Sequence, residues 1–345
     1  MFAAVVQTQN SKTLDIYSID VEGGQSTLFV APSGETMLVD AGLPGPRDSG
    51  RIIAAAKAAG VKQIDYMVNT HFDGDHVGGV AEVAAQIPIR TFVDHGSIIP
   101  SATERAVATY QTYVGVRAKG RHITATPGTQ IPIMGLNVTV VAAGGKFIEQ
   151  PLQGGGAPNP LCGDFTPLKD PESEDDNSVG FVLRYGRFSM IDLGDLTWNQ
   201  EHHLACPRNP LGLVDLYLTT RHGLNGAGGP FIVHALRPRV AVMNNGPTKG
   251  ASREAWMTVK NSPGLEDLWQ LHYSVARPAS ASPALHESSA MGGQEFNTAG
   301  QMIANLDEAP EHATVHNIKI SVRQDGSFVV TNPRNSFSKE YKPRR

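Results

Sequence analysis

Cysteine is scarce in this chain, and long apolar runs are missing. Cys162 and Cys206 are the only cysteines among 345 residues, which excludes a framework of several disulfides but allows one bridge in an oxidising compartment. A bridge and two free thiols stay equally open, because the sequence does not show whether the pair meets. No run approaches the roughly 18 apolar residues that a membrane helix requires, so we expect no membrane segment.

The chain also lacks an excess of positive charge. Its 29 lysine and arginine residues stand against 33 aspartate and glutamate residues, for a formal net charge of −4. This balance gives no general attraction to nucleic acid, so we expect a small-molecule or phosphodiester substrate and no stable nucleic-acid complex. The motifs of a serine nucleophile elbow and of phosphate-cradling glycine loops are missing as well. No feature of the sequence indicates an oligomeric state.

Three stretches interrupt the regular pattern of the chain. Residues 1–12 start with a brief apolar run and turn polar, and we expect a flexible N-terminus or the remnant of a trimmed signal. That reading favours a periplasmic or secreted location, with the cytoplasm as the alternative. Residues 13–345 are expected to form a single domain in which 144–177 and 275–312 are long loops. Loops of that length inside a domain are usually functional or disordered.

The remaining segments alternate between short β-branched or aromatic runs and helical patterns, and 40% of the residues are hydrophobic. The predicted strands cover residues 13–20, 26–31, 35–40, 64–69, 89–94, 138–143, two strands within 178–195, 214–220, 239–245, 267–273, 318–324 and 327–332. The predicted helices cover residues 51–60, a segment from 77 to 86, about 102–118, 197–205, 229–236 and 252–262. Hairpins and βα units in both halves favour a core of two packed sheets covered by helices.

The stretch THFDGDHVGG, residues 70–79, concentrates groups that bind metals. His71, Asp73, Asp75 and His76 occupy six positions directly after the predicted strand 64–69. Neutral imidazole and carboxylate are metal ligands, and a turn leaving a strand can aim several of them at one point. The alternative is a polar turn whose aspartates cap the next helix. Four metal-binding side chains in six positions favour the metal site.

The stretch HFDGDHVGG resembles the HxHxDH motif of the metallo-β-lactamase superfamily, with Asp73 in place of the second histidine. Asp40 in LVDAG resembles the early aspartate of that family, which orients ligands. Asp195 in IDLGDLT resembles the aspartate that bridges two metals, and His222 in LTTRHGLN resembles the last histidine ligand. The resemblance implies a four-layer αββα sandwich of the α/β class, with an active site at the shared edge of its two sheets.

A finer resemblance points to the hydrolase domain of DNA-uptake competence proteins. Those domains also show HxDxDH, a later strand similar to NSVGFVL, and an asparagine-rich turn similar to VMNNG at 242–246. The histidine and proline that usually follow that turn are missing here. This resemblance favours a phosphodiester substrate.

The resemblance divides the ligands between two metal sites. The second site would consist of Asp75, His76, Asp195 and His222, and all four are present. The first site would consist of His71, Asp73, a third histidine and the shared Asp195.

The third histidine of the first site is missing from the sequence. VVAAGGK stands where it is expected, at the end of the predicted strand 138–143. His95 is the best substitute by position, and an ordinary loop histidine is the alternative. Asp176 or Asn177 could also contribute from the long loop.

The substitution at Asp73 bears on the metal and on the chemistry. The resemblance implies one or two Zn²⁺ ions, whereas a harder carboxylate shifts the first site toward Mn²⁺, Mg²⁺ or Fe²⁺, or weakens it for zinc. We expect a metal-dependent hydrolase in which a metal-bound hydroxide attacks a phosphodiester or a carboxylic ester, lactone or lactam. Asp75 would steer the water, and Asp73 would act as ligand or base. The alternative is a catalytically impaired binding protein of the same fold.

Three further polar residues follow strands on the predicted active edge, where loops usually recognise substrates. They are Arg221, Asn245 and Lys249. Arg221 and Lys249 could pair with a phosphate or carboxylate group. Solvated surface charge is the alternative for each.

Overall fold

The computed structural model describes residues 13–169, 172–275, 294–307 and 314–344. The predictions for residues 1–12 and for most of the loop 275–312 therefore lie outside the described residues. Within the described ranges no helix is long and apolar enough to cross a membrane.

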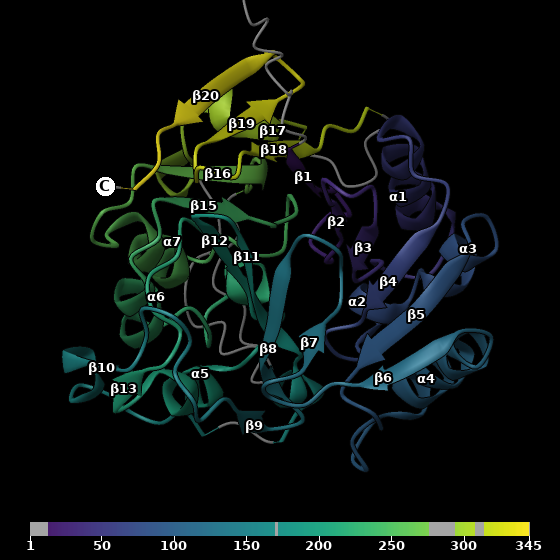
Figure 1. Cartoon of the computed structure of the whole chain (residues 1–345), viewed down its shortest axis with the longest axis horizontal. Coiled ribbons are helices and arrows are strands. Elements are labelled where there is room, and N and C mark those ends of the chain that lie inside the picture. The colour runs from purple at the N-terminus through teal and green to yellow at the C-terminus, as the bar shows by residue number, and fades with distance from the viewer. Residues whose placement is uncertain (1–12, 170–171, 276–293, 308–313, 345) are drawn as a thin grey trace, which may run out of the picture.

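The first of two large sheets has nine strands in the order β20-β19-β18-β1-β2-β3-β4-β5-β6 (Figure 1). Its strands are β1 (Leu14–Ser18), β2 (Thr27–Val30), β3 (Thr36–Val39), β4 (Ile64–Val68), β5 (Ile89–Asp94), β6 (Arg121–Thr124), β18 (Ile318–Val322), β19 (Phe328–Asn332) and β20 (Phe337–Tyr341). Pairing is antiparallel from β20 to β3 and parallel from β3 to β6. The parallel part brings the carboxyl ends of β3, β4 and β5 to one edge.

The second sheet also has nine strands, with the order β17-β16-β15-β14-β12-β11-β8-β7 and β9 paired to β8. Its strands are β7 (Gln130–Ile131), β8 (Asn137–Ala143), β9 (Lys146–Phe147), β11 (Gly180–Tyr185), β12 (Phe188–Asp192), β14 (Leu216–Leu218), β15 (Val240–Met243), β16 (Asp267–His272) and β17 (Ile303–Asn305). The neighbours from β12 to β17 are parallel. A separate two-stranded ribbon pairs β10 (Ala157–Pro158) with β13 (Arg208–Asn209).

Among the described residues, seven α-helices lie along the outer faces of the two sheets. They are α1 (Pro46–Ala58), α2 (Gly74–Val77), α3 (Val80–Ala84), α4 (Glu104–Arg117), α5 (Trp198–Ala205), α6 (Pro230–Leu236) and α7 (Arg253–Lys260). Apolar residues of α1, α3 and α4 pack on the first sheet, and those of α5, α6 and α7 pack on the second. The two groups of helices lie on opposite sides of the pair of sheets (Figure 1).

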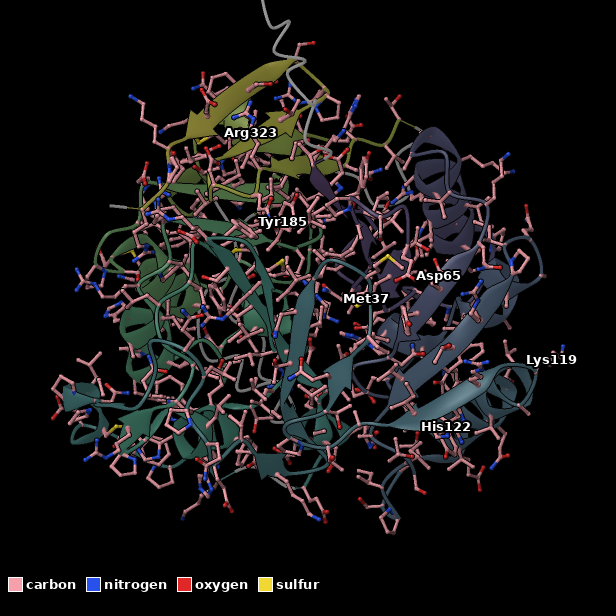
Figure 2. All side chains as sticks on the ribbon, in the orientation of Figure 1. Met37, Asp65, Lys119, His122, Tyr185 and Arg323 are labelled. Carbon is pink, nitrogen blue, oxygen red and sulfur yellow. A yellow bond between two sulfur atoms is a disulfide. The ribbon has the colours of Figure 1, made fainter. Side chains whose placement is uncertain are left out.

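The largest apolar cluster lies between the sheets and draws on strands of both. Phe29 of β2 meets Phe181 of β11 edge to face, with ring centroids 6.2 Å apart. Met37 of β3 lies in this interior, whereas Lys119 projects at the rim (Figure 2). The order of layers is helix, sheet, sheet, helix, so the predicted αββα fold is confirmed.

The structure differs from the predicted elements at a few places. The helix predicted from residue 51 starts at Pro46, because proline is well tolerated at the first helical position. The helix predicted from residue 77 is divided into α2 and α3. A Cβ on Gly78 would lie only 2.3 Å from the Gly74 carbonyl oxygen and 2.4 Å from Pro44, so only glycine allows this close approach. The polar strand β20 was not predicted, because its alternation is weak at the sheet edge.

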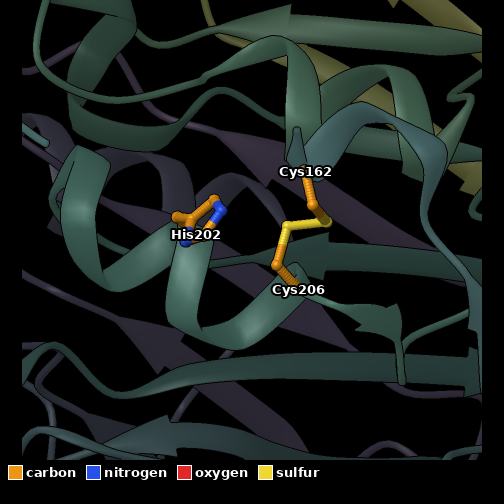
Figure 3. Close-up of side chains that lie close together, drawn as sticks. All are labelled: Cys162, His202 and Cys206. Atoms are coloured by element: carbon orange, nitrogen blue, oxygen red, sulfur yellow. A yellow bond between two sulfur atoms is a disulfide. The ribbon is translucent and has the colours of Figure 1, made fainter. Parts of the chain in front are cut away.

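The loop 144–177 contains short elements and is cross-linked to α5. It includes β9, β10 and the 3₁₀ turns η1 (Pro160–Cys162) and η2 (Glu174–Asn177). Cys162 and Cys206 form a disulfide, which the sequence had left open (Figure 3). The bridge ties η1 to the end of α5.

Glu201 of α5 is a fully buried carboxyl group, and it accepts a hydrogen bond from the Gly229 backbone N–H at 3.2 Å. Burial raises the pKa of Glu201 from its ordinary value of 4.5 to about 8, although hydrogen bonds from Gly229 and Thr220 oppose the shift. Between these two values the folded chain keeps a proton that the unfolded chain has lost. The contribution of this group to stability therefore falls as pH rises through this range.

We expect Glu201→Gln, which keeps the shape of the side chain, to stabilise the protein at high pH. The free energy of unfolding should exceed that of the wild type by on the order of 2 kcal/mol at pH 8.5 and by little at pH 5. Urea unfolding at pH 5, 7 and 8.5 measures this difference, with the exposed Glu254→Gln of α7 as the control. A difference that does not change with pH would contradict the assignment.

Candidate metal centre

Four loops from both sheets meet where β3, β4, β12 and β14 end. Asp40 follows β3, and the segment from His71 to His76 follows β4. Asp195 follows β12, and His222 lies in the 3₁₀ turn η3 (Thr220–Gly223) after β14. The carboxyl ends of the parallel strands therefore bring these residues to one place, as the sequence predicts.

The four residues predicted for the second site converge. The Nε2 atoms of His76 and His222 lie 3.3 Å apart. Asp195 places Oδ1 3.4 Å from His76 Nε2 and Oδ2 3.2 Å from His222 Nε2. Asp75 Oδ2 lies 3.5 Å from His76 Nε2 and 3.4 Å from His222 Nε2. Two imidazole nitrogens and two carboxylates thus face one small volume.

Asp40 sets which nitrogen of His76 faces that volume. Its Oδ2 lies 2.8 Å from His76 Nδ1, and its carboxylate also accepts from the Thr70 N–H at 2.8 Å and the Thr70 hydroxyl at 2.7 Å. The Nδ1 atom of His76 therefore donates its proton to Asp40, and Nε2 is the nitrogen that faces the site. Asp40 adopts a left-handed backbone with φ 56°, which is uncommon for a residue with a side chain.

His222 is held in position by an unusual backbone and by the asparagine-rich turn. Arg221 and His222 have φ values of 53° and 57° within η3. The Asn244 side-chain nitrogen lies 3.3 Å from His222 Nδ1, and the Asn244 oxygen accepts from the Thr219 hydroxyl at 3.1 Å. Sequence analysis noted this turn but not Asn244 itself.

A second group of possible ligands contains His71, Asp73 and Asp175, whose ligand atoms lie within 4.8 Å of one another. His71 Nε2 lies 3.3 Å from Asp175 Oδ1 and 3.9 Å from Asp73 Oδ2. His71 Nδ1 lies 3.1 Å from the Thr70 hydroxyl. The buried Nε2 atom of His71 is therefore the nitrogen that faces the two carboxylates.

Asp175, and not the predicted Asp176 or Asn177 of the same loop, is the residue whose carboxylate faces His71. The Asp176 carboxylate instead accepts from the Ser173 N–H at 3.0 Å and from the Thr197 hydroxyl at 2.6 Å. These two contacts fix the η2 turn and leave Asp175 facing His71. The acidic run was a visible signal, but the sequence did not show which carboxylate points inward.

His95, the suggested substitute ligand, lies apart from these groups. Its Nε2 is 2.7 Å from Glu174 Oε1, and its ring packs on Phe72 with centroids 4.4 Å apart. Glu174 also accepts from the Ile99 N–H at 3.0 Å. Among the described residues His95 belongs to none of the ligand groups, and the pair fixes the loop beside Asp175.

The three predicted substrate-binding residues occupy different surroundings. Arg221 pairs with Asp175, with Nη2 2.8 Å from Oδ2. Lys249 Nζ contacts Asp75 Oδ2, and 36% of the lysine side chain is exposed. Asn245 is fully buried, and its amide donates to the Gly246 and His272 carbonyl oxygens. Two cations therefore border the centre, whereas Asn245 faces the protein interior.

Mutual attraction sets the charges of the second site. Burial opposes ionisation of Asp75, but Lys249, His76 and His222 together hold its pKa well below the usual range. Burial likewise opposes ionisation of Asp195, and the two histidines lower its pKa. Burial disfavours the charged form of His76, yet the surrounding carboxylates raise its pKa well above the usual range.

The donor set fits divalent metal ions. Carboxylates and imidazole nitrogens are their ordinary ligands, and two imidazole nitrogens 3.3 Å apart require a cation or a proton between them. The Nε2 atom of His71 is buried without a hydrogen-bond partner, which likewise suits a bound cation beside His71. Asp195 lies within 4.8 Å of both His71 and His76, so it borders both sites.

We expect Asp175→Ala to empty the first site selectively. Loss of one of its carboxylates should weaken Mn²⁺ binding there by at least about tenfold and reduce the metal content from two ions per chain toward one. Elemental analysis after Mn²⁺ loading and desalting measures the content. The control is Asp164→Ala, an exposed carboxylate of the same loop. An unchanged content in Asp175→Ala would remove this residue from the site.

The amino-terminal part of the chain matches a known protein family. Residues 20–156 match the family model described as the metallo-beta-lactamase superfamily. No match was found among curated proteins.

Several solved structures are similar to this chain, all at low identity. A metallo-beta-lactamase of Cronobacter sakazakii with a HARLDQ motif is 18% identical over 54% of this chain and 64% of its own, with a TM-score of 0.32. A metallo hydrolase from the archaeon Ignicoccus hospitalis is 15% identical over 74% of this chain and 94% of its own (TM-score 0.42). The metallo-beta-lactamase fold protein YhfI of Bacillus subtilis is 10% identical over 75% and 96%, respectively (TM-score 0.44). The segment 20–156, which includes the residues from His71 to His76, is therefore similar to the metallo-beta-lactamase superfamily.

Proposed function

We propose that the protein is a metal-dependent hydrolase whose substrate is a phosphodiester. The observation that supports it most is the convergence of two imidazole nitrogens and two carboxylates in the buried second site. Residues 13–345 would act as one domain, and the substrate would be a small molecule or a phosphodiester rather than a stably bound nucleic acid.

Two metal positions are proposed. Asp75, His76, Asp195 and His222 would hold one ion, and His71, Asp73 and Asp175 would hold another beside Asp195. Bound metals would lower the pKa of water to roughly 7 and polarise the bond that breaks. Zn²⁺ suits the imidazole-rich second site, whereas Mn²⁺ or Fe²⁺ suits the carboxylate-rich first site.

The two aspartates of the motif have different surroundings and hence different roles. Asp75 Oδ2 is engaged by Lys249 and lies near two imidazoles, so this carboxylate is held in one orientation. That favours steering of water and substrate. The side chain of Asp73 is 48% exposed and lies 3.9 Å from His71. Asp73 is the carboxylate that can both approach a metal and pass a proton to solvent.

The charges at the rim favour an anionic substrate. Lys249 carries an ammonium group at the edge of the second site, and Arg221 carries a guanidinium at the first. A phosphodiester brings the negative charge that such groups attract. The likeness of the motif to the hydrolase domain of competence proteins agrees with this choice. Esters, lactones and lactams are the alternative substrates, and the assay described below distinguishes them from a phosphodiester.

One observation favours a second candidate, a binding protein with an incomplete centre. The Arg221 guanidinium already neutralises Asp175, and the first site offers a single imidazole. A metal-free or mononuclear chain is therefore the competing outcome. A periplasmic or secreted location is part of our proposal, and the disulfide supports it because such bonds persist in oxidising compartments.

We expect a metal content near two ions per chain, and a fall by at least one ion in His76→Ala and in His222→Ala. Both variants remove a nitrogen that faces the second site. His203→Ala removes an exposed histidine of α5 and is the control. Elemental analysis after supplementation with Zn²⁺ or Mn²⁺ provides the measurement. A metal content below about 0.2 ion per chain, without rescue of activity by added metal, would contradict the enzyme proposal and favour the binding protein.

We expect hydrolysis of bis-p-nitrophenyl phosphate to exceed that of nitrocefin and of a lactone panel. Lys249→Ala should lower kcat/KM for the phosphodiester by about 10-fold to 100-fold, because a charge-assisted contact is worth roughly 1.5–3 kcal/mol. The loss for an uncharged lactone should be smaller. Lys57→Ala, an exposed lysine of α1, is the control. Faster hydrolysis of a lactone or of nitrocefin would contradict the proposed phosphodiester substrate and indicate a carbonyl substrate.

A further inference from the structure

A separate group of metal-ligand side chains lies where η1 meets the end of α5. Cys162 comes from η1, and Cys206 follows α5 directly (Figure 3). His202 lies four residues before Cys206, and the Cys206 N–H donates to its carbonyl oxygen at 2.9 Å. Residues four apart on a helix face the same side. One ring nitrogen of His202 and both sulfur atoms lie within 4.8 Å of one another.

The His202 ring is held in a fixed orientation. It stacks on Phe165 with centroids 3.6 Å apart at 11°, and it meets Phe231 edge to face at 5.3 Å. Its Nε2 atom is buried and has no hydrogen bond.

The kinds of ligand atom in this group suit a soft metal. The three ligands comprise two sulfur atoms and one nitrogen, with no carboxylate. This combination selects Zn²⁺ over Mn²⁺ or Mg²⁺.

We propose that Cys162, His202 and Cys206 form a zinc site when their disulfide is reduced. A thiol or dithiol reductant supplies two electrons and two protons, which break the sulfur–sulfur bond and give two thiols. Zn²⁺ then binds both thiolates and one ring nitrogen of His202, and the two protons are released. In the oxidised chain the sulfurs are bonded to each other, so no site exists.

The backbone geometry allows both forms. The Cα atoms of Cys162 and Cys206 are 5.8 Å apart. Two thiolates on a tetrahedral zinc lie about 3.8 Å apart, a separation that rotation of the side chains reaches from this backbone. Zinc would then replace the disulfide as the link between the loop 144–177 and α5. The site is independent of the proposed hydrolase function, since the first and second sites contain no sulfur.

The test counts zinc in the full chain in two redox states. The chain is saturated with Zn²⁺ and desalted, either oxidised or after phosphine reduction under argon. We expect one additional ion per chain after reduction. With Co²⁺ in place of zinc, a sulfur-to-metal charge-transfer absorption should appear only in the reduced chain, and neither metal site of the hydrolase can produce it.

Variants identify the ligands. His202→Ala should weaken the added zinc by at least about tenfold, and Cys206→Ser should abolish the charge-transfer band. His203→Ala, the exposed neighbour on the same helix, should match the wild type. Equal zinc content in the two redox states would overturn the proposal, as would equal affinity in His202→Ala and His203→Ala.

The proposal can also be tested if the reduced chain loses its fold. Near-ultraviolet circular dichroism reports the packing of the reduced chain. If zinc restores that signal in the wild type and not in His202→Ala, the site is supported. If the signal is lost and zinc restores nothing, the proposal is overturned.

Discussion

The centre depends on the hydrogen bonds that Asp40 accepts. This single carboxylate, fully buried at the end of β3, binds the His76 Nδ1 proton and both donors of Thr70. Thr70 in turn lies beside the Nδ1 atom of His71. One carboxylate therefore fixes the proton on the inner nitrogen of His76 and, through Thr70, favours the same arrangement in His71. Both Nε2 atoms therefore face the groups of carboxylates, one in each site.

The second constraint is charge. Asp75 and Asp195 are ionised within a buried cluster, and Asp73 and Asp175 face the same region. Buried anions are costly unless cations balance them. Lys249 and Arg221 supply part of the balance. Divalent metal ions would supply the remaining positive charge and would lie between the two imidazole nitrogens that are in contact. For this reason the proposed function starts from metal binding.

Much of the fold and half of the centre could be predicted from local patterns. Strand β5 has the predicted bounds, and the four residues proposed for the second site come together as the family resemblance implied. The strand depends on a short-range signal, namely its β-branched and aromatic residues, whereas the grouping of Asp195 and His222 with His76 depended on the resemblance. The separation of α2 from α3 was missed; the backbone leaves the helical conformation at Gly79, beside Gly78, whose close contact is with Pro44, distant in sequence.

The first site shows the same limit more clearly. Asp175 and Asp176 are neighbours in one acidic run, and only the contacts of Asp176 with Ser173 and Thr197 decide which carboxylate faces His71. The disulfide also depends on two segments meeting, and the cysteine count alone could not show it. His95 follows a strand that ends at the same edge, so its position in the sequence was compatible with a ligand. In the structure it contacts Glu174 and stabilises the loop instead.

The asymmetry between the two sites follows from where their ligands come from. The second site draws its ligands from loops anchored directly on strands and helices, so two imidazoles can be held 3.3 Å apart. The first site takes Asp175 from the loop 144–177, and its geometry is only as fixed as that loop. The Glu174 contact with His95, the Asp176 contact with Thr197 and the link between Cys162 and Cys206 hold the loop at three points. A change in any of these three contacts should therefore alter the first site before the second.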